Sequence, residues 1–111
     1  GMKYKHYAPK AHVTILRGGF EAYRAYVSAH AGPGVWALCF DGEGERLPVP
    51  SVCYGAKEDD AAQARELFSA LRRLDEKGAQ TVYARCPHVD GVGLAVHNRL
   101  VRAAAYEVVE L

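Results

Sequence analysis

The sequence predicts an α/β fold, a three-layer sandwich in which a mostly parallel sheet of about five strands is flanked by about three helices. Two observations support this prediction. Short β-branched or apolar runs alternate along the chain with longer segments of helical periodicity. Glycine, proline and aspartate separate almost every pair of these segments. With 111 residues, 50% of them hydrophobic and 24% charged, the chain suits one domain built around one core.

The first half of the chain predicts three strands and one helix. Residues 12–16 contain a Val-Thr-Ile run, and β-branched residues favour strands. Residues 20–30 show helical spacing between a Gly-Gly pair and a Gly-Pro-Gly break. Residues 35–40 are almost entirely apolar, which is typical of a strand buried on both faces. A short strand is expected at residues 51–54. Its direction stays open, because the preceding connection has no visible helix and is short for a parallel crossover.

A long amphipathic helix is expected over residues 60–77. Its apolar stripe consists of Ala64, Leu67, Phe68, Leu71 and Leu74. Asp60 and Gln63 resemble a capping box at the start of this helix. Gln63 is expected to lie largely outside the apolar stripe. Gly78 stands where a left-handed residue is expected to end the helix.

The remaining chain predicts a strand, a loop, a helix and a final strand. Residues 81–84 read as a strand, and residues 86–93 contain the proline and glycines of a loop. A helix is expected over residues 94–105, and its apolar face consists of Leu94, His97, Val101 and Ala104. We expect His97 to be a partly buried, hydrogen-bonded histidine rather than a catalytic residue. Residues 106–111 read as the last strand.

Charge and cysteine content limit the classes of function. Lys and Arg total 14 against 13 Asp and Glu, and nucleic-acid binders usually show a basic excess or face, so no direct nucleic-acid binding is expected. No apolar run approaches the roughly 18 residues of a membrane span, so no membrane partner is expected. Cys39, Cys53 and Cys86 lie in apolar runs, which suggests free buried thiols in a reducing cytoplasm.

Candidate ligand-binding residues lie where the predicted strands end, because ligands of open α/β sheets bind at that edge. The possible anion-binding edge consists of Arg17, Gly18, Gly19, Lys57, Gly91 and Gly93. The alternative is that these glycines only form tight turns between strands and helices. No metal site is expected, since Cys86 and His88 lack the second ligand pair of a zinc site. No nucleophile signature surrounds Cys86, so no catalytic residue is assigned.

Residues 1–11 form a separate N-terminal segment that is rich in tyrosine, lysine and histidine. Tyrosine provides rigid amphipathic contact area, and lysine and histidine provide hydrogen-bond donors to anionic groups. The segment therefore suits a contact with a partner, while the alternative is a loose chain end.

Three segments resemble the long-form threonylcarbamoyl-AMP synthases of the YrdC/Sua-five family. Residues 1–9 resemble the interdomain linker of that family, which typically reads S-P-G-M-K-Y-[KR]-H-Y-x-P. Residues 67–75 are similar to the family's L-F-x-A-L-R-x-L-D segment, and residues 91–100 are similar to its G-L-G-x-A-x-x-N-R-L segment. The three matches follow the family's order and span essentially the whole chain.

The resemblance implies a linker arm at residues 1–11 and a Rossmann-like C-terminal domain at residues 12–111. In the family, a YrdC-like domain in cis performs the nucleotidyltransferase-type synthesis of threonylcarbamoyl-AMP for tRNA threonylcarbamoyladenosine. That domain binds the substrates ATP with magnesium, threonine and bicarbonate, and none of its sequence is among these 111 residues. The resemblance therefore implies no cofactor and no catalytic residue of the family in this sequence. The resemblance implies that the linker residues cover the catalytic pocket and exclude water from the intermediate. These residues are Lys5, His6, Tyr7 and Pro9.

Two other functions remain open for the globular part. It fits a stand-alone nucleotide- or anion-binding module, with its site at the carboxyl edge of the sheet. It also fits a protein-interaction domain that positions the catalytic domain, and an oligomer is compatible with either.

Overall fold

The computed structural model describes residues 8–111. They form a five-stranded sheet with the strand order β3-β2-β4-β1-β5, and every neighbouring pair of strands is parallel. The elements are β1 (His12–Arg17), α1 (Phe20–Ala29), β2 (Val35–Cys39), the 3-10 helix η1 (Gly44–Arg46), β3 (Ser51–Cys53), α2 (Asp60–Glu76), β4 (Thr81–Arg85), α3 (Gly91–Ala103) and β5 (Val108–Glu110). The predicted fold class is confirmed, and the direction of β3, left open by the sequence, is parallel.

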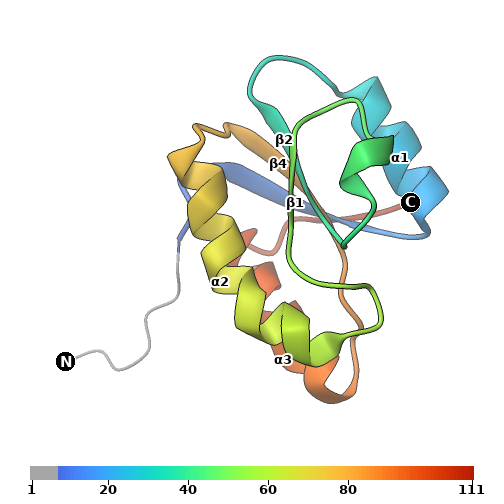
Figure 1. The fold of residues 1–111 in the computed structure, drawn as a ribbon, viewed down its shortest axis with the longest axis vertical. Helices are drawn as coiled ribbons and strands as arrows, with labels where there is room; N and C mark the ends of the chain where they lie inside the picture. Colours follow the sequence, from blue (N-terminus) through green and yellow to red (C-terminus); the bar gives the residue numbers. More distant parts are fainter. Residues whose placement is uncertain (1–7) are drawn as a thin grey trace.

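The helices lie on both faces of the sheet, so the protein has three layers (Figure 1). On one face, Tyr23 and Val27 of α1 are fully buried against β2 and the end of β1. On the other face, α2 and α3 pack together and bury a larger core that contains Leu67, Leu74 and Val96. The prediction that the central strand after residue 34 is buried on both faces fits this arrangement, because β2 lies inside the sheet.

The start of α2 differs from the prediction. Asp59, rather than Asp60, is the N-cap, and its carboxylate accepts a hydrogen bond from the backbone N–H of Ala62 at 2.9 Å. Gln63 does not complete a capping box, because its side chain is fully buried and donates to two backbone carbonyls instead. Gln63 lies one helical turn before Leu67 and therefore on the same buried face. The sequence did not predict this position, because glutamine is polar.

The predicted apolar stripe of α2 is also too wide. Phe68 remains 49% exposed, whereas Leu67, Ala70, Leu71 and Leu74 are buried. The arginine Arg72 covers part of the exposed ring, with its guanidinium carbon 5.5 Å from the ring centroid of Phe68.

The helix α3 begins at Gly91, three residues before the predicted start at Leu94. Its buried face consists of Gly93, Val96 and Leu100, and the predicted face residue Leu94 is 45% exposed. A Cβ atom at Gly93 would lie 2.7 Å from both the Cβ and the carbonyl oxygen of His88. Only glycine therefore lets α3 pack this close to the preceding loop.

The histidine His97 is partly buried, as predicted, but it is not fully hydrogen-bonded. Its Nδ1 atom has no hydrogen-bond partner among residues 8–111. Burial lowers the pKa of His97, and the nearby charge of Arg17 lowers it further.

The chain enters the domain at the amino-terminal edge of the sheet. The backbone N–H groups of Lys10 and Ala11 donate to the carboxylate of Asp75 at 3.1–3.3 Å, and Ala11 is only 6% exposed. This contact connects the chain before β1 to the end of α2. Of the four predicted linker residues, Pro9 is partly buried, whereas Lys5, His6 and Tyr7 lie outside the described residues.

Candidate functional site

The connections of the sheet reverse direction between its neighbouring strands β1 and β4. After β1 the chain crosses through α1 toward β2, and after β4 it crosses through α3 toward β5 on the other side. The two crossover helices therefore cover opposite faces of the sheet and leave a crevice outside the carboxyl ends of β1 and β4. Open α/β sheets bind their ligands at such a topological switch point.

A small pocket of about 90 Å³ occupies this position. We call it the switch-point pocket, and it is lined by Gly18, Gly19, Phe40, Lys57, Arg85, Cys86 and His88. The lining residues follow the carboxyl ends of β1, β2, β3 and β4, so the parallel sheet brings them together from distant parts of the sequence.

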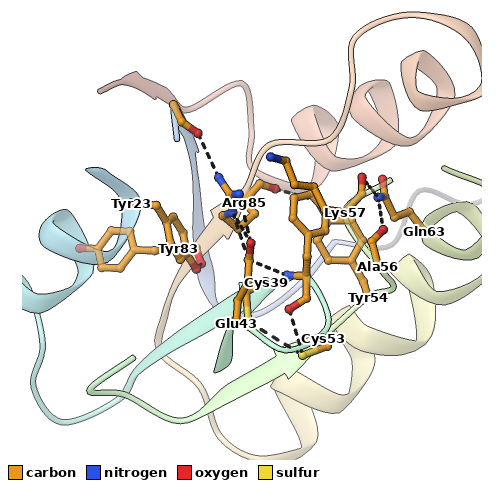
Figure 2. Close-up of polar contacts among 12 residues, drawn as sticks. Tyr23, Cys39, Glu43, Cys53, Tyr54, Ala56, Lys57, Gln63, Tyr83 and Arg85 are labelled. Atoms are coloured by element: carbon orange, nitrogen blue, oxygen red, sulfur yellow. Dashed lines mark hydrogen bonds and ion pairs between the residues drawn. The ribbon is translucent and has the colours of Figure 1, made fainter. Parts of the chain in front are cut away.

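The electrostatic centre of the pocket is Arg85, the last residue of β4, whose side chain is 4% exposed (Figure 2). Its Nε and Nη2 atoms donate to the carboxylate of Glu43 at 3.1–3.2 Å, and Nη1 donates to the carbonyl oxygen of Gly18 at 3.0 Å. The backbone N–H of Phe40 also donates to Glu43 Oε1 at 3.0 Å. The ion pair thus connects the ends of β1, β2 and β4.

Aromatic side chains surround the same guanidinium. The ring centroids of Phe20, Tyr23 and Phe40 lie 5.2–5.6 Å from its central carbon, within reach of cation–π attraction. Two buried tyrosines fix the backbone of β4, because Tyr23 donates to the carbonyl of Tyr83 and Tyr54 donates to that of Arg85, both at 2.7 Å. Burial raises the pKa of both tyrosine hydroxyls, so they stay protonated and keep these donors.

A side chain of α2, that of Gln63, holds the loop that carries Lys57. Gln63 Nε2 donates to the carbonyl oxygens of Ala56 and Lys57 at 2.8 and 3.0 Å, as Figure 2 shows. Gly55 has a φ of +115°, which favours glycine, and a Cβ there would press against the backbone of Gln63 at 3.2 Å. The exposed side chain of Lys57 therefore projects from a fixed backbone.

Three of the six residues of the predicted anion-binding edge line the pocket: Gly18, Gly19 and Lys57. Arg17 lies nearby but pairs with Glu110 at 3.1 Å. Gly91 and Gly93 belong to the first turn of α3 and do not line the pocket. Gly18 is required by its surroundings, since its φ is +153° and a Cβ would lie 2.9 Å from Leu111 Cβ.

The sequence reasoning missed the charged centre of the site. Arg85 and Glu43 are 42 positions apart in the sequence, and neither belongs to a recognisable motif. The sequence does contain one signal for Arg85: it is an arginine at the end of a β-branched strand, and ligands of such sheets bind at that edge. His88, from the predicted loop over residues 86–93, also lines the pocket and contacts Asp60 through Nδ1 at 2.9 Å.

The three cysteines are free thiols in the structure, and Cys39 is buried as expected, whereas Cys53 and Cys86 are half-buried. Cys39 and Cys53 are register partners on β2 and β3, and their sulfur atoms lie 4.0 Å apart. Burial raises the pKa of the thiols of Cys39 and Cys86. Within residues 8–111, no group of three or more His, Cys, Asp or Glu side chains is arranged to hold a metal ion. No helix in that range is long and apolar enough to cross a membrane.

Comparison with known proteins places this arrangement in a family. The family described as "Threonylcarbamoyl-AMP synthase, C-terminal domain" matches residues 1–105. The threonylcarbamoyl-AMP synthase of Pyrococcus abyssi is 35% identical over 118 residues, which cover 100% of this chain and 33% of the relative. The Bacillus subtilis synthase is 34% identical over 115 residues, which cover 98% of this chain and 32% of the relative.

Solved structures agree with the sequence comparison. The structure of Pyrococcus abyssi Sua5 complexed with L-threonine matches 100% of this chain with 33% of its own, at 28% identity and a TM-score of 0.74. The structure of the C-terminal Sua5 domain from Pyrococcus horikoshii matches 94% of this chain with 100% of its own, at 27% identity and a TM-score of 0.68.

A parallel sheet between two helical layers, with a charged pocket at its carboxyl edge, defines a small α/β domain of the open-sheet type. The chain belongs to the family of threonylcarbamoyl-AMP synthase C-terminal domains. It spans about a third of the length of the curated synthases that it matches.

Proposed function

We propose that this chain is the non-catalytic C-terminal domain of a cytoplasmic L-threonylcarbamoyladenylate synthase that acts in tRNA threonylcarbamoyladenosine formation. The observation that supports the proposal is the family match over residues 1–105 combined with the one-third coverage of the relatives. A YrdC-like domain in the same protein would bind ATP with magnesium, threonine and bicarbonate and perform the nucleotidyltransferase-type reaction.

The proposed role of this domain is to hold the linker at residues 1–11 in place. The linker ends at Ala11, where its backbone is bound by Asp75 and its side chain enters the core. A fixed end limits the volume that the preceding residues can reach, which raises their effective concentration at one place on the catalytic domain. Lys5, His6, Tyr7 and Pro9 would then cover the catalytic pocket and exclude water from the mixed anhydride.

The first test asks whether the 111-residue chain is inactive alone. We expect no threonine-dependent release of pyrophosphate from ATP by the purified chain. The matched control is the same assay with the product of the whole reading frame, in which a YrdC-like domain is expected upstream. Synthesis of threonylcarbamoyl-AMP by the 111-residue chain, or an upstream frame without that domain, would contradict the proposal.

The second test addresses the linker in the two-domain protein. We expect Tyr7→Ala to increase the fraction of threonylcarbamoyl-AMP that is hydrolysed before transfer, because the pocket loses part of its cover. Arg65→Ala, an exposed change on α2, is the control for a general effect of substitution. Equal hydrolysis in the Tyr7 variant and in the unchanged protein would exclude the covering role.

A further inference from the structure

We propose that the switch-point pocket is a binding site for one phosphate-sized oxyanion, either a free phosphate or a phosphoryl group of a larger molecule. The proposal concerns the globular domain alone and does not depend on the proposed function. It rests on four observations: the topology, the free backbone donors, the balance of charge and the size of the pocket.

The start of α1 adjoins the pocket, because Gly18 and Gly19, which precede the helix, line it. Gly19 is the N-cap of α1, and no side chain caps this helix end. The N–H groups of Phe20, Glu21 and Ala22 have no hydrogen-bond acceptor among residues 8–111. An uncapped helix start attracts an anion through these donors and through the helix dipole. A Cβ added at Gly19 would meet nothing within 4 Å, so the space beside these donors is open.

Two side-chain cations add to these backbone donors. The hydrogen bonds of Arg85 to Glu43 and Gly18 use Nε–H, one Nη1–H and one Nη2–H, which leaves two of its five donors. The ammonium group of Lys57 forms no ion pair with any residue of the described chain. The guanidinium is buried and fixed, while Lys57 stands at the mouth and can close on a ligand.

The residues of the described chain that line the pocket include two cations, Lys57 and Arg85, and no carboxylate. Glu43 binds Arg85, Glu110 binds Arg17, and both Asp60 and Glu58 contact His88, which itself lines the pocket. The lining itself is therefore cationic, and it favours an anion over a cation.

The size of the pocket limits the ligand. A volume of about 90 Å³ admits a tetrahedral oxyanion, whereas sites that enclose a drug-sized molecule measure roughly 300–1,000 Å³. The pocket would therefore hold only the phosphoryl group of a nucleotide, with the base and the sugar outside. Inorganic phosphate is sufficient as the probe, and nucleotides show whether the groups outside the pocket add affinity.

The experiment is a titration of the ¹⁵N-labelled 111-residue chain with inorganic phosphate, followed through its amide resonances at constant, low ionic strength. The relative from Pyrococcus horikoshii, whose solved chain is this domain alone, shows that such a domain folds by itself. We expect the amides of Gly19, Phe20 and Lys57 to shift together along one binding curve. Parallel titrations with adenosine monophosphate and with methyl phosphate distinguish a nucleotide ligand from the phosphoryl group alone.

Two variants test the residues. Lys57→Ala should weaken phosphate binding about tenfold, as expected for the loss of one charge-assisted contact, while Lys77→Ala at the opposite edge should leave it unchanged. Gly19→Asp should abolish binding, because the carboxylate caps the free N–H groups and repels the anion. The backbone of Gly19 has φ −72° and ψ 168°, so the variant should fold without strain. Gly19→Asn is the neutral control and should bind more strongly than Gly19→Asp.

The outcomes separate clearly. A common binding curve at these three amides, lost in Gly19→Asp and weakened in Lys57→Ala, supports the site. Phosphate that shifts no amide of Gly19 or Phe20 at millimolar concentration overturns it. Equal affinity in the unchanged chain and in both pocket variants also overturns it, because binding would then occur elsewhere.

Discussion

Glu43 and Arg85 form a forked ion pair in which Oε1 lies 3.1 Å from Nε and Oε2 lies 3.1 Å from Nη2. The side chains are 14% and 4% exposed. Glu43 belongs to the turn after β2, and Arg85 ends β4, so the pair joins two neighbouring strands of the sheet at their carboxyl ends.

Replacing Arg85 with methionine should destabilise the domain by about 3–5 kcal/mol, because Glu43 is left as a buried and unpaired charge. Urea denaturation followed by circular dichroism measures the change. The double variant Glu43→Leu with Arg85→Met should recover part of the loss, since no charge is then buried alone. A single Arg85→Met variant with unchanged stability would show that the ion pair is solvated in solution.

The carboxylate of Asp75 should hold the start of the domain in place. Asp75→Ala removes the acceptor for the N–H groups of Lys10 and Ala11, and we expect a loss of about 1–3 kcal/mol. Amide hydrogen exchange of Lys10 and Ala11 should accelerate in this variant. The neighbouring exposed change Glu76→Ala is the control and should leave both exchange rates unchanged. Unaltered exchange in Asp75→Ala would argue against the anchor.

The thiol of Cys39 should react slowly with alkylating reagents. Burial raises its pKa, and only the thiolate is nucleophilic, so less of the reactive form is present at any given pH. The variant with Cys53→Ala and Cys86→Ala leaves Cys39 as the remaining cysteine. Iodoacetamide at pH 8 should label it quickly in urea and slowly in the folded state. Similar rates in both states would mean that the strand β2 opens readily.

The stability of the domain should decrease in mild acid because of His97. Its pKa in the folded state lies below its ordinary value of 6.5, so the unfolded chain binds more protons as the pH falls through that value. The contribution of His97 to the free energy of unfolding is fully present above about pH 6.5, and it is lost as the pH falls below this value. His97→Asn should flatten the dependence of the unfolding free energy on pH below about pH 6.5. A slope that His97→Asn leaves intact would assign the effect to other groups.

The elements of this fold were predictable because each depends on nearby residues. The β-branched run of β1 and the helical spacing of α2 are local patterns, and both were found within a few residues of their bounds. The direction of β3 was not predictable, because its connection contains only the short helix η1 and gives no local signal of a crossover.

The errors in the helices have a common physical cause. Gln63 was placed outside the core because it is polar, although its amide nitrogen donates to two backbone carbonyls, which compensates for part of its burial. The apolar face of α3 was placed around Leu94, because Gly93 offers no hydrophobic signal and is nevertheless the residue closest to the loop at His88. Both positions are determined by contacts with the loop that precedes each helix, and hydrophobic periodicity gives no signal of such contacts.

The candidate site was predictable only in part. Gly18, Gly19 and Lys57 could be assigned to the carboxyl edge because strand ends can be read from the sequence. Arg85 and Glu43 could not be paired without the strand order, which brings β4 between β1 and β2.

The strand β1 has a mechanical role that follows from its two ends. It directly follows the residues held by Asp75 and leads into Gly18, whose carbonyl oxygen accepts a hydrogen bond from Arg85 in the pocket. β1 is paired with β4 over residues 12–16 and with β5 over residues 15–17, both in parallel. A pull on the linker acts along the strand and loads these hydrogen bonds together in shear rather than one after another. The domain should therefore resist tension from a tethered partner, and any strain that moves β1 would reach the pocket at its far end.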